Sequence, residues 1–136
     1  MKQRLLILLL IISGCGYAQR KETVELSATQ SSTLDPKAFK EKLSAESGVI
    51  VLDVRTPDEA SEGIIPGAVI MDFNAPDFKS KIAKLDKTKT YLVYCKVGGR
   101  SAKAVNLMAS DGIKNVFHLD GGYDAWIKNG FETVKP

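Results

Sequence analysis

Short runs of apolar and β-branched residues recur along the chain, and most are followed by a segment whose apolar residues have helical spacing. Runs without regular polar alternation are typical of strands buried on both faces of a sheet. The runs occupy residues 48–55 (GVIVLDVR), 67–73 (GAVIMDF), 90–95 (TYLVYC) and 115–119 (NVFHL). We therefore predict strands in these segments.

The segments between the strands favour helices. Asp35 and Pro36 have the character of an N-cap and a first helical residue, and Phe39 and Leu43 would share one face of the helix that follows. Further helical or turn patterns cover residues 56–63, 77–85, 100–112 and 122–130. This alternation predicts an α/β domain with a mostly parallel sheet and helices on both faces. In such sheets ligands bind beyond the carboxyl ends of the strands.

The N-terminus has a different pattern. Lys2 and Arg4 precede the uninterrupted apolar run LLILLLII, which is well short of the about 20 residues that a membrane-spanning helix needs. A basic start, a short apolar run and small residues after it are typical of a secretion signal. The sequence ISGC, Ile12–Cys15, resembles the lipobox of bacterial lipoproteins, in which the cysteine is lipidated and becomes the new N-terminus. Ordinary cleavage after Ala18 is the alternative.

These patterns predict three parts: a signal peptide over residues 1–14, a flexible tether over 15–33 and one folded domain over 34–136. The tether is polar and rich in serine and threonine, and a short edge strand at Val24–Leu26 is the alternative there. Either cleavage predicts export, to the periplasmic side of a bacterial membrane. Lipid on Cys15 would anchor the protein to that membrane; without it the protein would be soluble in the periplasm.

Composition and charge limit the classes of function that the protein can have. With 44% hydrophobic and 26% charged residues, the 136-residue chain is suited to a single globular domain. Removal of residues 1–14 leaves 17 basic against 16 acidic residues. A nearly neutral chain with scattered basic residues does not indicate nucleic-acid binding. No metal ion or other cofactor is expected, and the oligomeric state is left open.

The candidate chemistry lies at Cys95. If Cys15 carries lipid, Cys95 has no disulfide partner and is a lone thiol in an oxidising compartment. In the sequence CKVGGRS, Cys95 lies at the end of a predicted strand. Two glycines lie between it and the start of the next predicted helix. A loop that closes at a helix start directs backbone N–H groups inward and favours an anion. We predict a thiol with a lowered pKa; a cysteine packed as a small apolar residue is the alternative.

Four motifs, in order, resemble those of single-domain rhodaneses, which are sulfurtransferases. CKVGGRS matches the family's loop C-x-x-G-x-R-S. LDVRTPDE resembles its first signature, with Asp53 and Arg55 at the matching places. The other two motifs are GIIPGA at Gly63–Ala68 and LDGGYDAW at Leu119–Trp126. The resemblance covers about residues 35–134 and implies a three-layer fold around a five-stranded sheet.

The resemblance also implies a mechanism. The Cys95 thiolate attacks the outer sulfur of a small anion such as thiosulfate, and the resulting persulfide passes its sulfur to cyanide or a thiol. Arg55 would attract the donor or pair with Glu59. The remaining residues expected to bind substrate and persulfide are those of the loop: Lys96, Val97, Gly98, Gly99, Arg100 and Ser101.

Two alternatives accompany this hypothesis. Some phosphatases and arsenate reductases share the fold, but their loop is one residue longer; the shorter spacing between Cys95 and Arg100 favours sulfur over phosphate. A non-enzymatic persulfide or redox carrier, or a rhodanese-like interaction module, is the second alternative. Ile64 stands where the family usually has histidine. The only histidine, His118, lies in a strand pattern and is predicted to be structural.

Overall fold

The computed structural model describes residues 30–136. They form a sheet of five parallel strands in the order β1-β5-β4-β2-β3. The strands are β1 (Gln30–Leu34), β2 (Ile50–Asp53), β3 (Val69–Ile70), β4 (Thr90–Tyr94) and β5 (Asn115–Leu119). The helices are α1 (Pro36–Ala45), α2 (Pro57–Ser61), α3 (Phe78–Ala83), α4 (Gly99–Ser110) and α5 (Gly122–Lys128).

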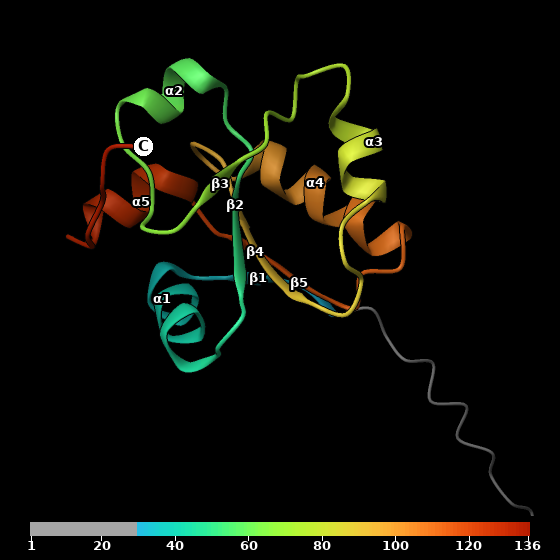
Figure 1. Cartoon of the computed structure of the whole chain (residues 1–136). Coiled ribbons are helices and arrows are strands. Elements are labelled where there is room, and N and C mark those ends of the chain that lie inside the picture. Colours follow the sequence, from blue (N-terminus) through green and yellow to red (C-terminus); the bar gives the residue numbers. More distant parts are fainter. Residues whose placement is uncertain (1–29) are drawn as a thin grey trace, which may run out of the picture.

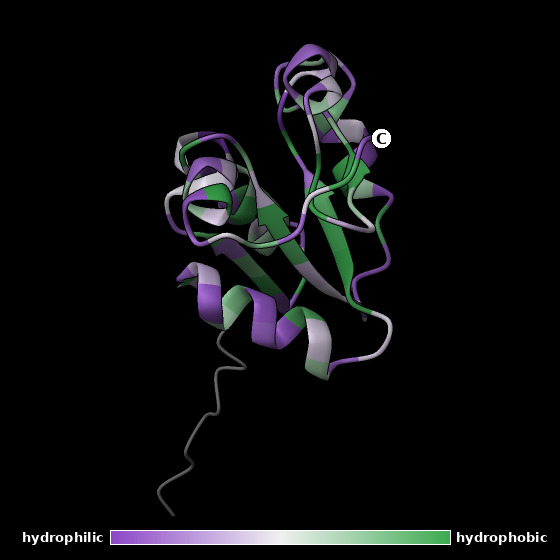
Figure 2. Cartoon of the chain, turned by 90° about the vertical axis from the view of Figure 1, so that its left-hand side faces the viewer, coloured by the Kyte–Doolittle hydropathy of each residue, from purple (hydrophilic) through white to green (hydrophobic). Residues whose placement is uncertain are grey.

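The sheet separates two layers of helices, as predicted. Helices α1 and α5 lie on one side of the sheet and α3 and α4 on the other (Figure 1). Alternate residues of β4 belong to different cores: Tyr91 and Val93 pack with α3 and α4, whereas Leu92 and Tyr94 pack with α1 and α5. Much of the sheet is coloured as hydrophobic, and hydrophilic residues alternate with hydrophobic ones along the helices (Figure 2). This two-sided burial explains the continuous apolar runs in the sequence.

Local signals explain where several helices begin. The Asp35 side chain accepts a hydrogen bond from the Ala38 amide at 2.8 Å, which caps α1. Thr56 and Glu59 form a reciprocal capping box at the start of α2. Both helices have proline in their first turn, where its missing N–H costs no hydrogen bond. The capping residues thus confirm the predicted helix starts.

Two predicted boundaries differ from the structure. Strand β1 includes Gln30–Thr33, which the sequence analysis placed in the tether; it pairs in parallel with all five residues of β5. Strand β3 is only Val69–Ile70, at the opposite edge of the sheet, so most of the run 67–73 is not strand. The signal peptide, Cys15 and the alternative strand at Val24–Leu26 lie outside the described residues. Within residues 30–136, none of the helices has the length and apolar character needed to span a bilayer.

Candidate active site

Cys95 follows the last residue of β4, at the carboxyl end of a central strand, and the loop after it leads into α4. The residue is 1% exposed and is a free cysteine. The Gly98 amide nitrogen lies 3.1 Å from the Cys95 sulfur, and the Ser101 hydroxyl oxygen lies 3.5 Å from it. The thiol therefore accepts a hydrogen bond from the Gly98 amide and donates one to the Ser101 hydroxyl, both within its own loop.

These contacts change the acidity of the thiol. Burial by itself would raise the pKa of Cys95, but the Ser101 hydroxyl and the amides of Ser101, Gly98 and Val97 favour the thiolate. The net effect is a pKa below the ordinary value of a cysteine. The expected lowering is confirmed, and its cause is hydrogen bonding inside the loop.

Glycines permit this loop geometry. Gly98 has φ 107°, a left-handed conformation that side chains rarely adopt. Gly122, in the first turn of α5, has φ 61°, and a Cβ there would lie 2.5 Å from the carbonyl carbon and oxygen of Lys96. This close approach lets the amides of Tyr123 and Asp124 donate to the carbonyl oxygens of Cys95 and Lys96, at 2.8 and 3.1 Å. The start of α5 therefore holds the backbone of the loop in place.

Two ion pairs hold the outside of the loop. Arg100 donates to both carboxylate oxygens of Glu59 at 2.7 Å, which braces α4 against α2. Hydrogen bonds from Arg100 hold the pKa of Glu59 at about 2. The Lys96 ammonium lies 2.9 Å from the Asp124 carboxylate of α5. Sequence reasoning missed Glu59 and Asp124 as loop partners; the capping box TPDE was the only available signal for Glu59.

Arg55 has a different partner from the one expected. Arg55 is 2% exposed and its guanidinium pairs with Asp53 at 2.6 Å, while the Glu59 carboxylate receives Arg100 instead. The Gly63 carbonyl accepts a further bond at 2.7 Å, and the Tyr123 ring lies 4.0 Å from the guanidinium carbon. The expected role of Arg55 in substrate binding stays a prediction.

The Asp53 carboxylate joins this buried cluster to β4. It is fully buried and accepts a hydrogen bond from the Tyr94 hydroxyl at 2.8 Å. Burial raises the pKa of Tyr94, which keeps its hydroxyl protonated as a donor. The same hydroxyl accepts from the Ile65 amide at 3.1 Å. Asp53 and Arg55 thus tie the loop after β2 to the strand that carries Cys95.

The remaining predicted positions are placed as follows. Val97 is 64% exposed at the outside of the loop, and Gly99 begins α4. Ile64, in the position of the family's usual histidine, is buried and exchanges two backbone hydrogen bonds with Val134. His118 is not only a strand residue, because its Nδ1 lies 3.4 Å from the Ser101 hydroxyl.

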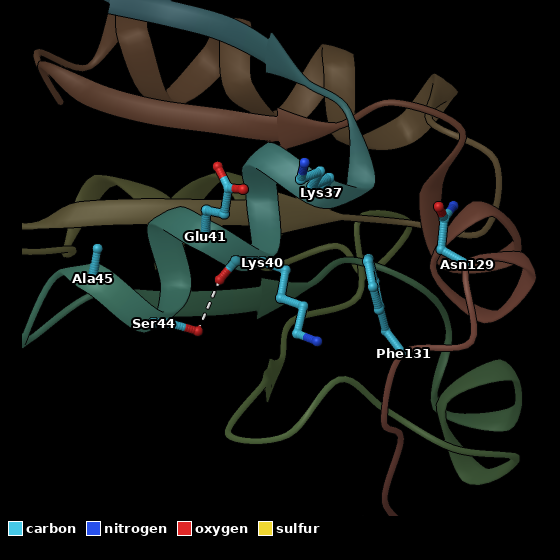
Figure 3. Close-up of a pocket in the computed structure, with 7 residues that line it drawn as sticks. All are labelled: Lys37, Lys40, Glu41, Ser44, Ala45, Asn129 and Phe131. Atoms are coloured by element: carbon cyan, nitrogen blue, oxygen red, sulfur yellow. Dashed lines mark hydrogen bonds between the residues drawn. The ribbon is translucent and has the colours of Figure 1, made fainter.

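A larger pocket lies away from Cys95. It has a volume of about 650 Å³ and lies between α1 and the segment after α5 (Figure 3). The Lys40 ammonium lies over the Phe131 ring, 4.4 Å from its centre. None of the lining residues belongs to the Cys95 loop; they are Lys37, Lys40, Glu41, Ser44, Ala45, Asn129 and Phe131. This pocket is therefore separate from the Cys95 loop.

The fold and the loop together define a class: small parallel α/β proteins with a cysteine held by its own loop at the carboxyl end of a central strand. Comparison with known proteins then identifies the family. The family model described as the rhodanese-like domain matches residues 35–129. The chain belongs to the rhodanese-like domain family.

Individual relatives agree with this assignment. A protein of Allochromatium vinosum named sulfurtransferase is 28% identical over 103 residues, covering 76% of this chain and 94% of the relative. Thiosulfate sulfurtransferase 16 of Arabidopsis thaliana is 36% identical over 92 residues, covering 60% and 77% of the two chains. The crystal structure of a rhodanese-related protein from Thermoplasma volcanium superposes with a TM-score of 0.67 at 28% identity, covering 75% of this chain and 96% of the other.

Proposed function

We propose that the protein is an exported sulfurtransferase that moves a sulfane sulfur from a thiosulfate-like donor to a thiophilic acceptor. The observation that carries this proposal is the position of the Cys95 sulfur, 3.1 Å from the Gly98 amide inside a loop that lowers its pKa. Relatives named as sulfurtransferases support the reaction class, and one of them is named for thiosulfate.

The reaction has two balanced steps. The Cys95 thiolate attacks the outer sulfur of the donor; a sulfur–sulfur bond to Cys95 forms, the bond inside the donor breaks, and sulfite leaves with the electron pair. The acceptor, cyanide or a thiolate, then attacks the outer sulfur of the persulfide, and Cys95 leaves as a thiolate. Backbone amides of the loop would stabilise the negative charge on sulfur in both steps.

Formation of the persulfide can be measured without choosing an acceptor. After incubation of the purified protein with thiosulfate, we expect the peptide that contains Cys95 to gain the mass of one sulfur atom. Cyanide should remove this mass, and prior alkylation of Cys95 should prevent its appearance. Absence of any adduct would contradict the proposal. An adduct that no acceptor removes would instead favour the non-enzymatic carrier.

Export and anchoring belong to the same proposal, and they rest on the sequence ISGC, which ends at Cys15. In bacterial cells grown with labelled fatty acid, we expect the protein to carry label and to sediment with membranes. Cys15→Ser should lose both properties, whereas Cys95→Ser, the matched control at the other cysteine, should keep them. Equal labelling of the two variants would rule out the anchor at Cys15, and cleavage after Ala18 would then be the remaining route of export.

A further inference from the structure

A series of polar contacts leads from Cys95 to the edge of the sheet. The Cys95 sulfur lies 3.5 Å from the Ser101 hydroxyl, and that hydroxyl lies 3.4 Å from Nδ1 of His118. Nε2 of His118 lies 2.9 Å from the Thr33 hydroxyl. Thr33 and His118 are directly paired in the parallel register of β1 and β5. Four residues from four different parts of the fold are therefore connected.

The direction of these hydrogen bonds follows from the number of hydrogens. The Ser101 hydroxyl has one hydrogen, and the Gly98 carbonyl accepts it at 3.1 Å. Ser101 can then only accept from His118, so Nδ1 carries the ring hydrogen and Nε2 accepts from the Thr33 hydroxyl. The ring is neutral in this arrangement. Burial lowers the pKa of His118, and this effect outweighs the opposing effect of the Asp120 carboxylate, which raises the pKa. The net lowering favours the neutral ring.

We propose that His118 is a positioning residue for Cys95 that acts through the Ser101 hydroxyl. When Cys95 is a thiolate, the Ser101 hydrogen turns from the Gly98 carbonyl to the sulfur. Thr33 then donates to His118, His118 to Ser101 and Ser101 to Cys95. Hydrogen bonds in such a series strengthen one another, so the series stabilises the thiolate. This inference rests on the proposed function in one respect: the thiolate is the nucleophile.

The surroundings of His118 support a polar role over a packing role. Its side chain is half-buried and borders a pocket of about 230 Å³. The pocket is lined by Ser32, Thr33, Ala102, Val105, Asn106 and His118. Apart from the histidine, these residues are uncharged, so Asp120 is the charged group that acts on the ring. A substitution at His118 should therefore leave both cores intact.

The test compares two variants of the full-length protein. His118→Leu removes the donor to Ser101, whereas His118→Asn keeps an N–H group close to the place of Nδ1. The readout is the rate at which iodoacetamide alkylates Cys95 as a function of pH, followed by mass spectrometry of the Cys95 peptide. The loss of one hydrogen bond changes an equilibrium constant, here that of thiol ionisation at Cys95, by about threefold to tenfold. We therefore expect Cys95 in His118→Leu to react about threefold slower at neutral pH. His118→Asn should react at close to the wild-type rate.

Several outcomes would overturn the inference. An unchanged alkylation profile in His118→Leu would do so, as would equal slowing in both variants, which would indicate a packing role. Circular dichroism melting curves report whether each variant is folded. If His118→Leu does not fold, Thr33→Val decides instead: we expect slower alkylation, and an unchanged profile would overturn the inference. Alkylation needs no sulfur donor, so this result is independent of whether the protein transfers sulfur.

Discussion

Sulfur transfer from thiosulfate to cyanide is expected to fall at least about a thousandfold in the Cys95→Ser variant. A serine hydroxyl is not ionised at neutral pH and cannot carry a sulfane sulfur as a persulfide, so both steps of the reaction are lost. The loop should persist, because a hydroxyl at this place can still accept the bond that the Gly98 amide donates to sulfur. The measurement is the rate of thiocyanate formation.

A matched control separates chemistry from folding. Lys81→Ala removes a solvent-exposed ion pair with Asp77 on α3 and leaves the loop untouched. We expect it to keep full turnover, with a melting temperature close to those of the wild type and of Cys95→Ser. Turnover above about one per cent of wild type in a folded Cys95→Ser protein would show that another group carries the sulfur.

The largest loss of stability is expected for Asp53→Ala. The Asp53 carboxylate is fully buried, and the Arg55 guanidinium that it accepts from at 2.6 and 2.9 Å is 2% exposed. Removing the carboxylate leaves a buried cation without its partner and the Tyr94 hydroxyl without its acceptor. Loss of one member of a buried ion pair costs about 3 to 5 kcal/mol. Urea denaturation should show this decrease in the free energy of unfolding.

Two further variants test the reason for the loss. If the unpaired cation is the cause, combining Asp53→Leu with Arg55→Met should restore most of the stability, because an apolar pair leaves no buried charge. Asp77→Ala, which breaks an exposed pair, should leave the urea midpoint nearly unchanged. A double variant no more stable than Asp53→Ala would show that Arg55 has other indispensable contacts, such as those with Gly63 and Tyr123.

The position of Cys95 in its loop followed from local sequence alone. An apolar strand that ends at Cys95, followed by Gly98 and a helix start, places a cysteine in a loop where amides converge. The structure confirms both the loop and the lowered pKa of Cys95. These features depend on residues within six positions of one another, so no long-range contact had to be known.

The partners of the charged residues did not follow from the sequence. Arg100 pairs with Glu59 across 41 positions and Lys96 with Asp124 across 28. Which acid meets which base depends on how α2 and α5 are placed against the loop. Arg55 pairs with Asp53, two positions away, while the Glu59 carboxylate receives Arg100. Charge alone does not select among several acids at similar separations.

Strand β1 could not be predicted from its own sequence either. Its sequence, QSSTL, has no apolar periodicity and therefore gave no signal for a strand. Its backbone N–H and C=O groups nevertheless find partners along β5, and an edge strand of this kind is stabilised by its neighbour. The pairing also brings Thr33 to His118, so the contact on which the further inference depends was not visible in the sequence.

By itself, the sequence determined the α/β fold class, the layered burial of the strands and the loop that holds Cys95, because each is encoded in spacing over a few residues. The tertiary structure alone decided the first edge strand, the pairing of Arg100 with Glu59 and of Lys96 with Asp124, and the contact from His118 to Ser101. These depend on closure of the sheet, which brings residues far apart in the sequence within hydrogen-bonding distance.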